Sequence, residues 1–340
     1  GAGGAFHTTE ASTLSTYYNP AGLGFLSKQA FALSIRNAPK TTTLASGFYS
    51  APTRSTTVDD GAGMLSHVGL AFPARILRSS RGVLGLSYTV GGFIDDTEIA
   101  AQGLLSGNIT LQNYLRAVDA KAEFVTLGYG QSSAAQTSSF GVGLIYARQS
   151  VGYFESYAIN NTPQTPTDLA STGYGFGAIV GLQASLGGTN GSVGISYRTP
   201  IDLQGNTDTA SLYDRIPGRL AGGIAIRRDS PRGRDYSVIG AQVEFFSGGR
   251  GQLAFDRSGN QTVVSGGYEH NFARAGGFVP VRLGYRSVPS GGAGYARRNT
   301  FTYGIGFRPD NQRYSFDLAF GAADNDAHDV IISFTSLLDK

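Results

Sequence analysis

The sequence predicts an all-β protein, a 14-stranded antiparallel transmembrane β-barrel with an N-terminal hatch, or plug, segment. The first observation is composition, because 49 of 340 residues are glycine and only 15% are charged, against roughly 25% charged in an ordinary soluble chain. The second is a period-two alternation of apolar with small or polar residues, which recurs almost from end to end and is typical of β-strands. The third is an alternation of short and long connections between these segments, which is typical of outer-membrane barrels.

What the composition lacks excludes several classes of protein. The chain has no Cys, so a disulfide scaffold, an iron–sulfur cluster, a thiolate zinc site and a Cys nucleophile are ruled out. The net charge is only +3 and no dense run of Lys and Arg occurs, so no nucleic-acid partner is expected. No segment approaches 18 uninterrupted apolar residues, which excludes an α-helical membrane protein.

Residues 1–29 do not alternate, so we expect them to form the hatch and residues 30–340 to form the barrel. Proline disfavours the helical region for the residue before it, and the Asn19 side chain can bond nearby backbone, so a rigid turn is expected. Taken alone, the same residues also fit an ordinary helix start, with Asn19 capping and proline in the first position. The expected hatch motif consists of Asn19, Pro20, Ala21 and Gly22.

Fourteen alternating segments follow the hatch. Most are 9 to 15 residues long, close to the roughly 9–11 residues with which a tilted strand crosses a membrane. We expect strands near residues 30–38, 64–77, 81–94, 120–131, 138–154, 172–186, 190–204, 216–228, 234–247, 262–272, 278–288, 299–308, 312–322 and 328–336.

The connections between these strands fall into two sets. An even strand count with short turns at one end and long loops at the other is the pattern of a bacterial outer-membrane barrel. The expected short turns are 78–80, 187–189, 229–233 and 309–311, and the expected long loops are 39–63, 95–119, 155–171, 205–215, 248–261 and 289–298. The last connection, 323–327, is short although its position belongs to the long set.

The two faces of each strand differ in the way a barrel in lipid requires. In 312–322, Phe316 and Leu318 fall on one face, while Asp317 and Ala319 fall on the other. The apolar face is expected to meet acyl chains and the small, polar face to line the lumen. A soluble β-sandwich or propeller would instead place the bulky face in a core, but no blade-length repeat supports a propeller.

Arginines on the polar faces are the candidate ligand-binding residues. A lumen with excess positive charge could hold an anionic head group, such as a carboxylate, through bidentate hydrogen bonds. The alternative is structural, because arginine–acid ladders can tie a barrel wall to its plug. The candidates are Arg198, Arg219, Arg282, Arg286 and Arg308, with Arg36 expected to point inward as well.

Enzymatic signals are weak, and we expect no enzyme activity, metal or other cofactor. The four histidines are widely separated and lack metal-ligand spacing. No Gly-x-Ser-x-Gly elbow or Walker loop occurs. The chain begins at Gly1 without a visible signal peptide, which an outer-membrane protein needs, so we expect it to be the processed chain.

Two long connections and one glycine pair carry local predictions. Leu111, Leu115 and Val118 stand at helical spacing and predict a short amphipathic helix within 95–119. The segment 39–63 is rich in Thr and Ser and is expected to be an extracellular, mobile loop. The glycines expected to kink the third strand near its end are Gly91 and Gly92.

Several short motifs resemble the long-chain fatty-acid transporter (FadL) family of outer-membrane proteins. The opening of the chain, which includes Gly3-Gly4-Ala5-Phe6 and Tyr18-Asn19-Pro20-Ala21-Gly22-Leu23, is similar to the family's opening. Three later segments resemble its strand motifs: Gly194–Pro200, Ile216–Leu220 and Asn299–Gly306. Two departures are that the chain is shorter than a typical member and that Glu10 stands where an Asp is usual nearby.

The resemblance implies a plugged 14-stranded barrel through which a hydrophobic, fatty-acid-like molecule diffuses passively. Ligand would be captured at the outer face and would leave sideways at a third-strand kink, at Gly91 and Gly92. Outer-membrane lipid and lipopolysaccharide are the expected surroundings. PorV-type barrels share the opening motif and act as subunits or partner-binding scaffolds of secretion or surface assemblies, which is the alternative function.

Overall fold

The structure is a computed structural model. It describes residues 2–37, 40–48, 51–59, 63–74, 82–100, 104–106, 109–187, 190–207, 215–231, 233–247, 260–288, 298–311, 313–323 and 328–338. Two short helices come first, α1 (Ser15–Tyr18) and the 3₁₀ helix η1 (Pro20–Phe25). The expected turn 78–80 lies outside the described residues. So do most of the residues in the expected connections 187–189, 205–215, 248–261, 289–298 and 323–327.

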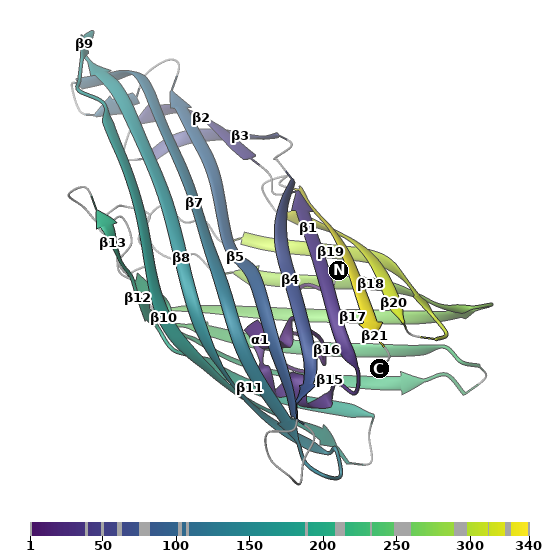
Figure 1. Ribbon diagram of the computed structural model, residues 1–340. Helices are drawn as coiled ribbons and strands as arrows, with labels where there is room; N and C mark the ends of the chain where they lie inside the picture. Colours follow the sequence, from purple (N-terminus) through teal and green to yellow (C-terminus); the bar gives the residue numbers. More distant parts are fainter. Residues whose placement is uncertain are drawn as a thin grey trace.

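Fourteen strands form one closed antiparallel wall (Figure 1). In order around the wall they are β1 (Gln29–Asn37), β4 (Gly63–Ala74), β5 (Gly82–Ala100), β7 (Ile109–Ser132), β8 (Ser138–Ile159), β10 (Thr167–Leu186), β11 (Gly191–Arg198), β15 (Arg219–Asp229), β16 (Tyr236–Phe246), β17 (Gln261–Arg274), β18 (Gly277–Val288), β19 (Arg298–Pro309), β20 (Tyr314–Ala323) and β21 (His328–Leu338). The ring closes because β1 pairs with β4 on one side and with β21 on the other, from Gln29↔Leu338 to Asn37↔Val330. The predicted all-β, 14-stranded antiparallel barrel is confirmed, and each predicted strand overlaps one strand of the wall.

Closure of the sheet explains why this chain can be stable within a lipid bilayer. Hydrocarbon offers no hydrogen-bond partners, so every backbone donor and acceptor of a spanning sheet must be paired within the sheet. The side chains alternate as predicted: Leu144 and Phe176 are strongly exposed on the outer face, while their neighbours Ile145 and Gly175 are buried. The outer face is therefore the apolar one.

One side of the barrel is much taller than the other (Figure 1). The strands β5, β7, β8 and β10 contain 19, 24, 22 and 20 residues, about twice what a tilted strand needs to span a bilayer. On the outer face of β7, exposed Val125 and Leu127 give way to Glu123 and Lys121, which form an ion pair of 2.7 Å. This change from apolar to charged residues marks the edge of the lipid layer.

The tall strands overturn two local predictions. The helix predicted within 95–119 is wrong, because this segment belongs to β5, to β6 (Leu104–Ser106) and to β7. Leu111 and Leu115 are four residues apart, a spacing that also keeps two residues on one face of a strand. The irregular loop predicted for 39–63 is wrong as well, since β2 (Lys40–Phe48) and β3 (Ala51–Asp59) form an antiparallel hairpin there. The extracellular position and the mobility of this segment stay predictions.

Other predicted boundaries also move. Within the expected loop 155–171, β8 continues to Ile159, β9 (Thr162–Pro163) pairs back onto it, and β10 begins at Thr167. The predicted strand 190–204 ends at Arg198, because the chain turns inward at Thr199-Pro200 and proline cannot donate to a sheet.

Three more short strands follow the inward turn at Thr199-Pro200. β12 (Ile201–Asp202) pairs with β14 (Arg215–Ile216) as a separate two-stranded sheet, and β13 (Gln204–Thr207) pairs with β10. Ile201 and Ile216 are buried together with Tyr17, Phe124, Ile145 and Ile179.

Candidate functional site inside the barrel

The candidate site is the N-terminal segment, residues 2–28, together with the inner face of the wall. Figure 1 shows α1 inside the ring of strands. Asn19 lies between α1 and η1 with extended backbone (φ −156°, ψ 95°), as expected for a residue before proline. Its side-chain oxygen accepts a hydrogen bond from the Ala21 amide at 3.2 Å, so it caps η1 with Pro20 in the first helical position.

Asn19 also connects the segment to itself and to the wall. Its side-chain amide donates to the Thr8 carbonyl at 2.7 Å and to the Leu182 carbonyl of β10 at 3.3 Å. The helix-start interpretation of this motif therefore holds, and the same buried side chain also makes the contacts of a turn. A hatch role for the motif stays a prediction.

Glycines of ten successive wall strands, from β4 to β18, lie directly against the segment. A Cβ atom at Gly181 would lie 1.8 Å from Asn19 Oδ1, and one at Gly194 would lie 1.9 Å from the Thr8 carbonyl oxygen. Only glycine permits so close an approach between wall and segment. The glycines concerned are Gly69, Gly85, Gly128, Gly130, Gly141, Gly181, Gly194, Gly223, Gly240, Gly267 and Gly284.

Buried polar side chains of the wall hold the segment between these glycines. Gln242 accepts from the Thr8 amide at 2.9 Å, and Gln183 donates to the Thr9 carbonyl at 2.7 Å. Ser139 donates to the Ala21 carbonyl at 2.6 Å. Sequence reasoning missed all three wall residues, although each stands on the small, polar face of its strand.

Two of the five candidate arginines tie the wall to the segment. Arg198 donates to the Tyr17 hydroxyl at 2.8 Å, and its guanidinium lies 5.2 Å from the centre of the Phe124 ring. Arg219 donates to the Tyr18 carbonyl at 3.2 Å and to Glu244 at 2.9 Å. Both arginines are buried.

The other three candidate arginines face carboxylates of the wall. Arg282 bonds Glu269 at 2.5 Å and also pairs with Asp317, and Arg308 lies 3.3 Å from Glu269. Arg286 lies 3.7 Å from Glu244 and keeps 43% of its side chain exposed. Binding of an anionic ligand by these arginines stays a prediction.

His7 packs beside the Arg219 and Glu244 pair. Its ring is stacked on Tyr18 with 3.8 Å between ring centres. Burial lowers the pKa of His7 to about 3, with the Arg219 and Arg286 charges acting in the same direction and Glu244 against them. His7 is therefore neutral at physiological pH.

The predicted kink coincides with an irregularity in the wall. The β5–β7 register shifts between Val90 and Gly92, so Gly91 sits at a β-bulge. A Cβ atom at Gly91 would lie 2.6 Å from the Tyr17 hydroxyl. A bulge bends a strand and redirects its side chains, and here it does so beside the N-terminal segment. Opening of the wall at this point stays a prediction.

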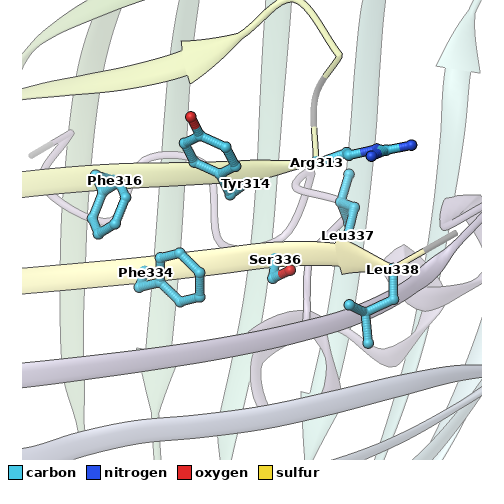
Figure 2. A pocket seen from close by; sticks show the side chains of 7 residues that line it. All are labelled: Arg313, Tyr314, Phe316, Phe334, Ser336, Leu337 and Leu338. Atoms are coloured by element: carbon cyan, nitrogen blue, oxygen red, sulfur yellow. The ribbon is translucent and has the colours of Figure 1, made fainter.

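Two grooves lie on the outer face of β19, β20 and β21. Figure 2 shows a groove of about 520 Å³ whose lining includes Tyr314, Phe316, Phe334 and Leu338, on β20 and β21. These side chains belong to the apolar outer face, so we assign the groove to contact with acyl chains. Within the described ranges, no three His, Asp or Glu residues are grouped as a metal site would require.

A closed barrel with an apolar outer face, short turns at one end and long extensions at the other has the architecture of a bacterial outer-membrane protein. No helix in the described part of the chain is long and apolar enough to cross a membrane.

Within that class, the fold is the FadL type. A Pseudomonas aeruginosa FadL homologue superposes with a TM-score of 0.63 at 12% identity, covering 99% of this chain and 96% of its own. The P. putida toluene transporter TodX gives 0.63 at 14% identity, with 98% and 96% covered, and the monoaromatic hydrocarbon channel CymD gives 0.55 at 13%, with 100% and 98% covered. No protein-family model and no curated protein sequence matches the chain.

Proposed function

We propose that this chain is an outer-membrane channel that passes hydrophobic, fatty-acid-like small molecules by passive diffusion, with its N-terminal segment acting as a hatch. The observation that carries the proposal is the row of glycines along which this segment contacts ten of the fourteen wall strands. The FadL-type fold supports it, because the similar structures include a toluene transporter and a monoaromatic hydrocarbon channel.

The route begins on the tall side of the barrel. The upper part of this wall carries a small apolar cluster of Ala120 and Val151, against which Tyr153 and Leu169 pack. A hydrophobic ligand would contact these side chains first and would then meet the buried cluster in which Tyr17 of the hatch packs with Phe124 of the wall.

Passage then requires the hatch to move. Movement would break the hydrogen bonds of Asn19 and free Arg198 and Arg219 from Tyr17 and Tyr18. The freed guanidiniums, together with the half-exposed Arg286 and Arg308, would offer charge-assisted hydrogen bonds to a carboxylate head group. Gly91 and Gly92 lie at the bulge beside Tyr17, and we propose this as the place where ligand leaves sideways.

A disulfide that fixes the hatch to the wall tests the proposal. The chain has no Cys, and a Cβ atom at Gly267 would lie 3.0 Å from the Ala5 Cβ, close to the roughly 3.5–4.5 Å of a disulfide. We expect the double variant Ala5→Cys with Gly267→Cys to stop uptake of a long-chain fatty acid when oxidised and to regain it when reduced.

The single variant Gly267→Cys is the matched control, because it places the same Cβ atom 2.7 Å from the Ala2 carbonyl oxygen, and its uptake is expected to ignore the oxidant. Equal uptake by the oxidised and reduced double variant would contradict a moving hatch. Absence of uptake by the unmodified chain would instead favour the scaffold alternative, in which the hatch never needs to move.

A further inference from the structure

The groove of Figure 2 forms where one small polar residue interrupts the apolar outer face. Across the β20–β21 pair, Tyr314 lies opposite Ser336 and Phe316 lies opposite Phe334. The centres of the Phe316 and Phe334 rings are 5.0 Å apart, whereas the Ser336 side chain is too small to fill the space opposite Tyr314. Leu338 bounds this space further along β21, and a groove of about 520 Å³ remains. This volume is in the range of roughly 300–1,000 Å³ that is typical of small-molecule sites.

A second groove extends the first towards the middle of the membrane. It has a volume of about 290 Å³, shares Phe316 with the first groove, and is also lined by Phe307, Leu318 and Ile332. From Leu338 back to Ile332, β21 covers six residues, or about 20 Å along the strand. At the roughly 45° tilt of a membrane strand this distance gives about 14 Å of depth, close to half of a hydrocarbon core about 30 Å thick. The two grooves together therefore match the depth of one leaflet.

The end of the groove beside the short turns is polar and positively charged. Arg313 lines the groove there, and Figure 2 shows its guanidinium pointing away from the apolar side chains. Ser336 contributes a hydroxyl to the lining. Lys28 directly precedes Gln29, which pairs with Leu338, so a second cation stands at the same end. Guanidinium and ammonium groups bind phosphate through charge-assisted hydrogen bonds.

The corresponding place on another side of the barrel lacks this charge. Leu182 is exposed on the outer face of β10, four residues before the strand ends, and Phe334 stands four residues before the end of β21. The sequence segments at the short turns beside Leu182, 132–138 and 186–191, contain no charged residue. The outer face of β20 and β21 therefore combines a groove with cations at a depth where Leu182 has no cation in the adjoining turns.

We propose that this groove binds one anionic phospholipid of the leaflet at the short-turn end, with an acyl chain along Phe316 and Phe334 and the phosphate at Arg313. A phospholipid fits because the groove opens on the face that meets acyl chains and carries its cations at the level of the head groups. A zwitterionic lipid gains less from these cations. The site lies outside the barrel interior and does not depend on movement of the hatch.

Quenching of a tryptophan in the groove by brominated phospholipids tests this site, because the chain has no Trp. The reporter is Phe334→Trp and the matched control is Leu182→Trp, each in the full chain in phosphatidylcholine vesicles. Brominated phosphatidylglycerol and brominated phosphatidylcholine are compared as minor components. We expect the anionic lipid to bind about five-fold more tightly than the zwitterionic lipid beside Phe334→Trp, since one cation near a membrane surface contributes about that factor. We expect equal binding of the two lipids beside Leu182→Trp.

Further changes in the Phe334→Trp background locate the site. Arg313→Gln, and Ser336→Leu, which fills the groove, should each lower the lipid preference to that at Leu182→Trp, while Arg313→Lys should keep most of it. Arg228→Gln removes an exposed arginine from the same end of the barrel at β15 and should leave the preference unchanged. Equal binding of the two lipids beside Phe334→Trp, or the same preference at both reporters, would overturn the proposal. A preference that survives either Arg313→Gln or Ser336→Leu would overturn it as well.

Discussion

At the scale of single residues, this wall differs from an ordinary sheet because the N-terminal segment lies so close to its inner face. Glycine normally weakens a strand because it has no side chain to pack and loses more entropy on folding. Here the missing Cβ atoms leave room for backbone and side chains of the N-terminal segment, as at Gly181 and Gly194. Contact with the enclosed segment thus accounts for eleven of the 49 glycines of the chain.

The first prediction compares two glycines on neighbouring strands. Gly194→Ala would place a Cβ atom 1.9 Å from the Thr8 carbonyl oxygen, whereas Gly222→Ala meets no atom closer than 4.0 Å. We expect Gly194→Ala to release the N-terminal segment, measured as faster amide hydrogen exchange over residues 2–28, and Gly222→Ala to leave exchange unchanged. Equal exchange in the two variants would show that wall and segment are not in close contact.

The second prediction concerns pH. The pKa of His7 is about 3 in the docked segment, against roughly 6.5 when it is free. The released segment therefore binds more protons between these two values, so docking weakens as pH falls from about 6.5 towards 3 and is constant above that window.

A single tryptophan can report this change, because the chain has none. In a Phe6→Trp background, quenching by iodide should rise as pH falls through that window. Adding His7→Gln should remove the His7 contribution to the rise. A pH response that is identical with and without His7→Gln would contradict the assignment.

At the scale of elements, the sequence predicted every wall strand but not where the strands end. Alternation marks a strand wherever one face is apolar, which holds for all fourteen. Beyond the lipid, the outer face of β7 turns polar at Glu123 and Lys121, so the pattern fades while hydrogen bonding to β5 and β8 continues. Pairing between strands sets those extensions, and pairing is not visible in one strand's sequence.

Contacts between the N-terminal segment and the wall were likewise only partly predictable from the sequence. The local turn of Asn19 and Pro20 could be predicted because it depends on neighbouring residues. Gln183 and Gln242 could not be predicted as partners of Thr9 and Thr8, because they meet the segment only after the barrel closes.

The third prediction tests the lipid edge within one strand. Leu144 and Ser150 lie on the outer face of β8, the first within the apolar band and the second beyond Arg148. We expect Leu144→Arg to cost about 2–4 kcal/mol of unfolding free energy and Ser150→Arg about 0–1 kcal/mol. Urea unfolding in lipid vesicles measures both, and similar costs at the two positions would place the lipid edge elsewhere.

At the scale of the whole molecule, the barrel is asymmetric in two ways. Its β5–β10 side is taller than the rest, and the described glycines that contact the N-terminal segment lie along β4 to β18. The taller side carries apolar clusters on its inner face, while the inner face near β19 to β21 carries ion pairs that include Arg36 with Asp329 and Arg282 with Asp317. The inner surface of the barrel therefore differs in polarity from one side to the other.

Quenching of single tryptophans by brominated acyl chains tests the arrangement most directly, because the wild-type chain contains no Trp. Leu182→Trp places the probe on the exposed outer face of β10, and Phe6→Trp places it in the N-terminal segment against Gly240. Brominated lipid should quench Leu182→Trp strongly and leave Phe6→Trp nearly unaffected. Equal quenching at the two positions, or quenching at Phe6→Trp alone, would contradict a barrel that faces lipid outside and encloses its N-terminus.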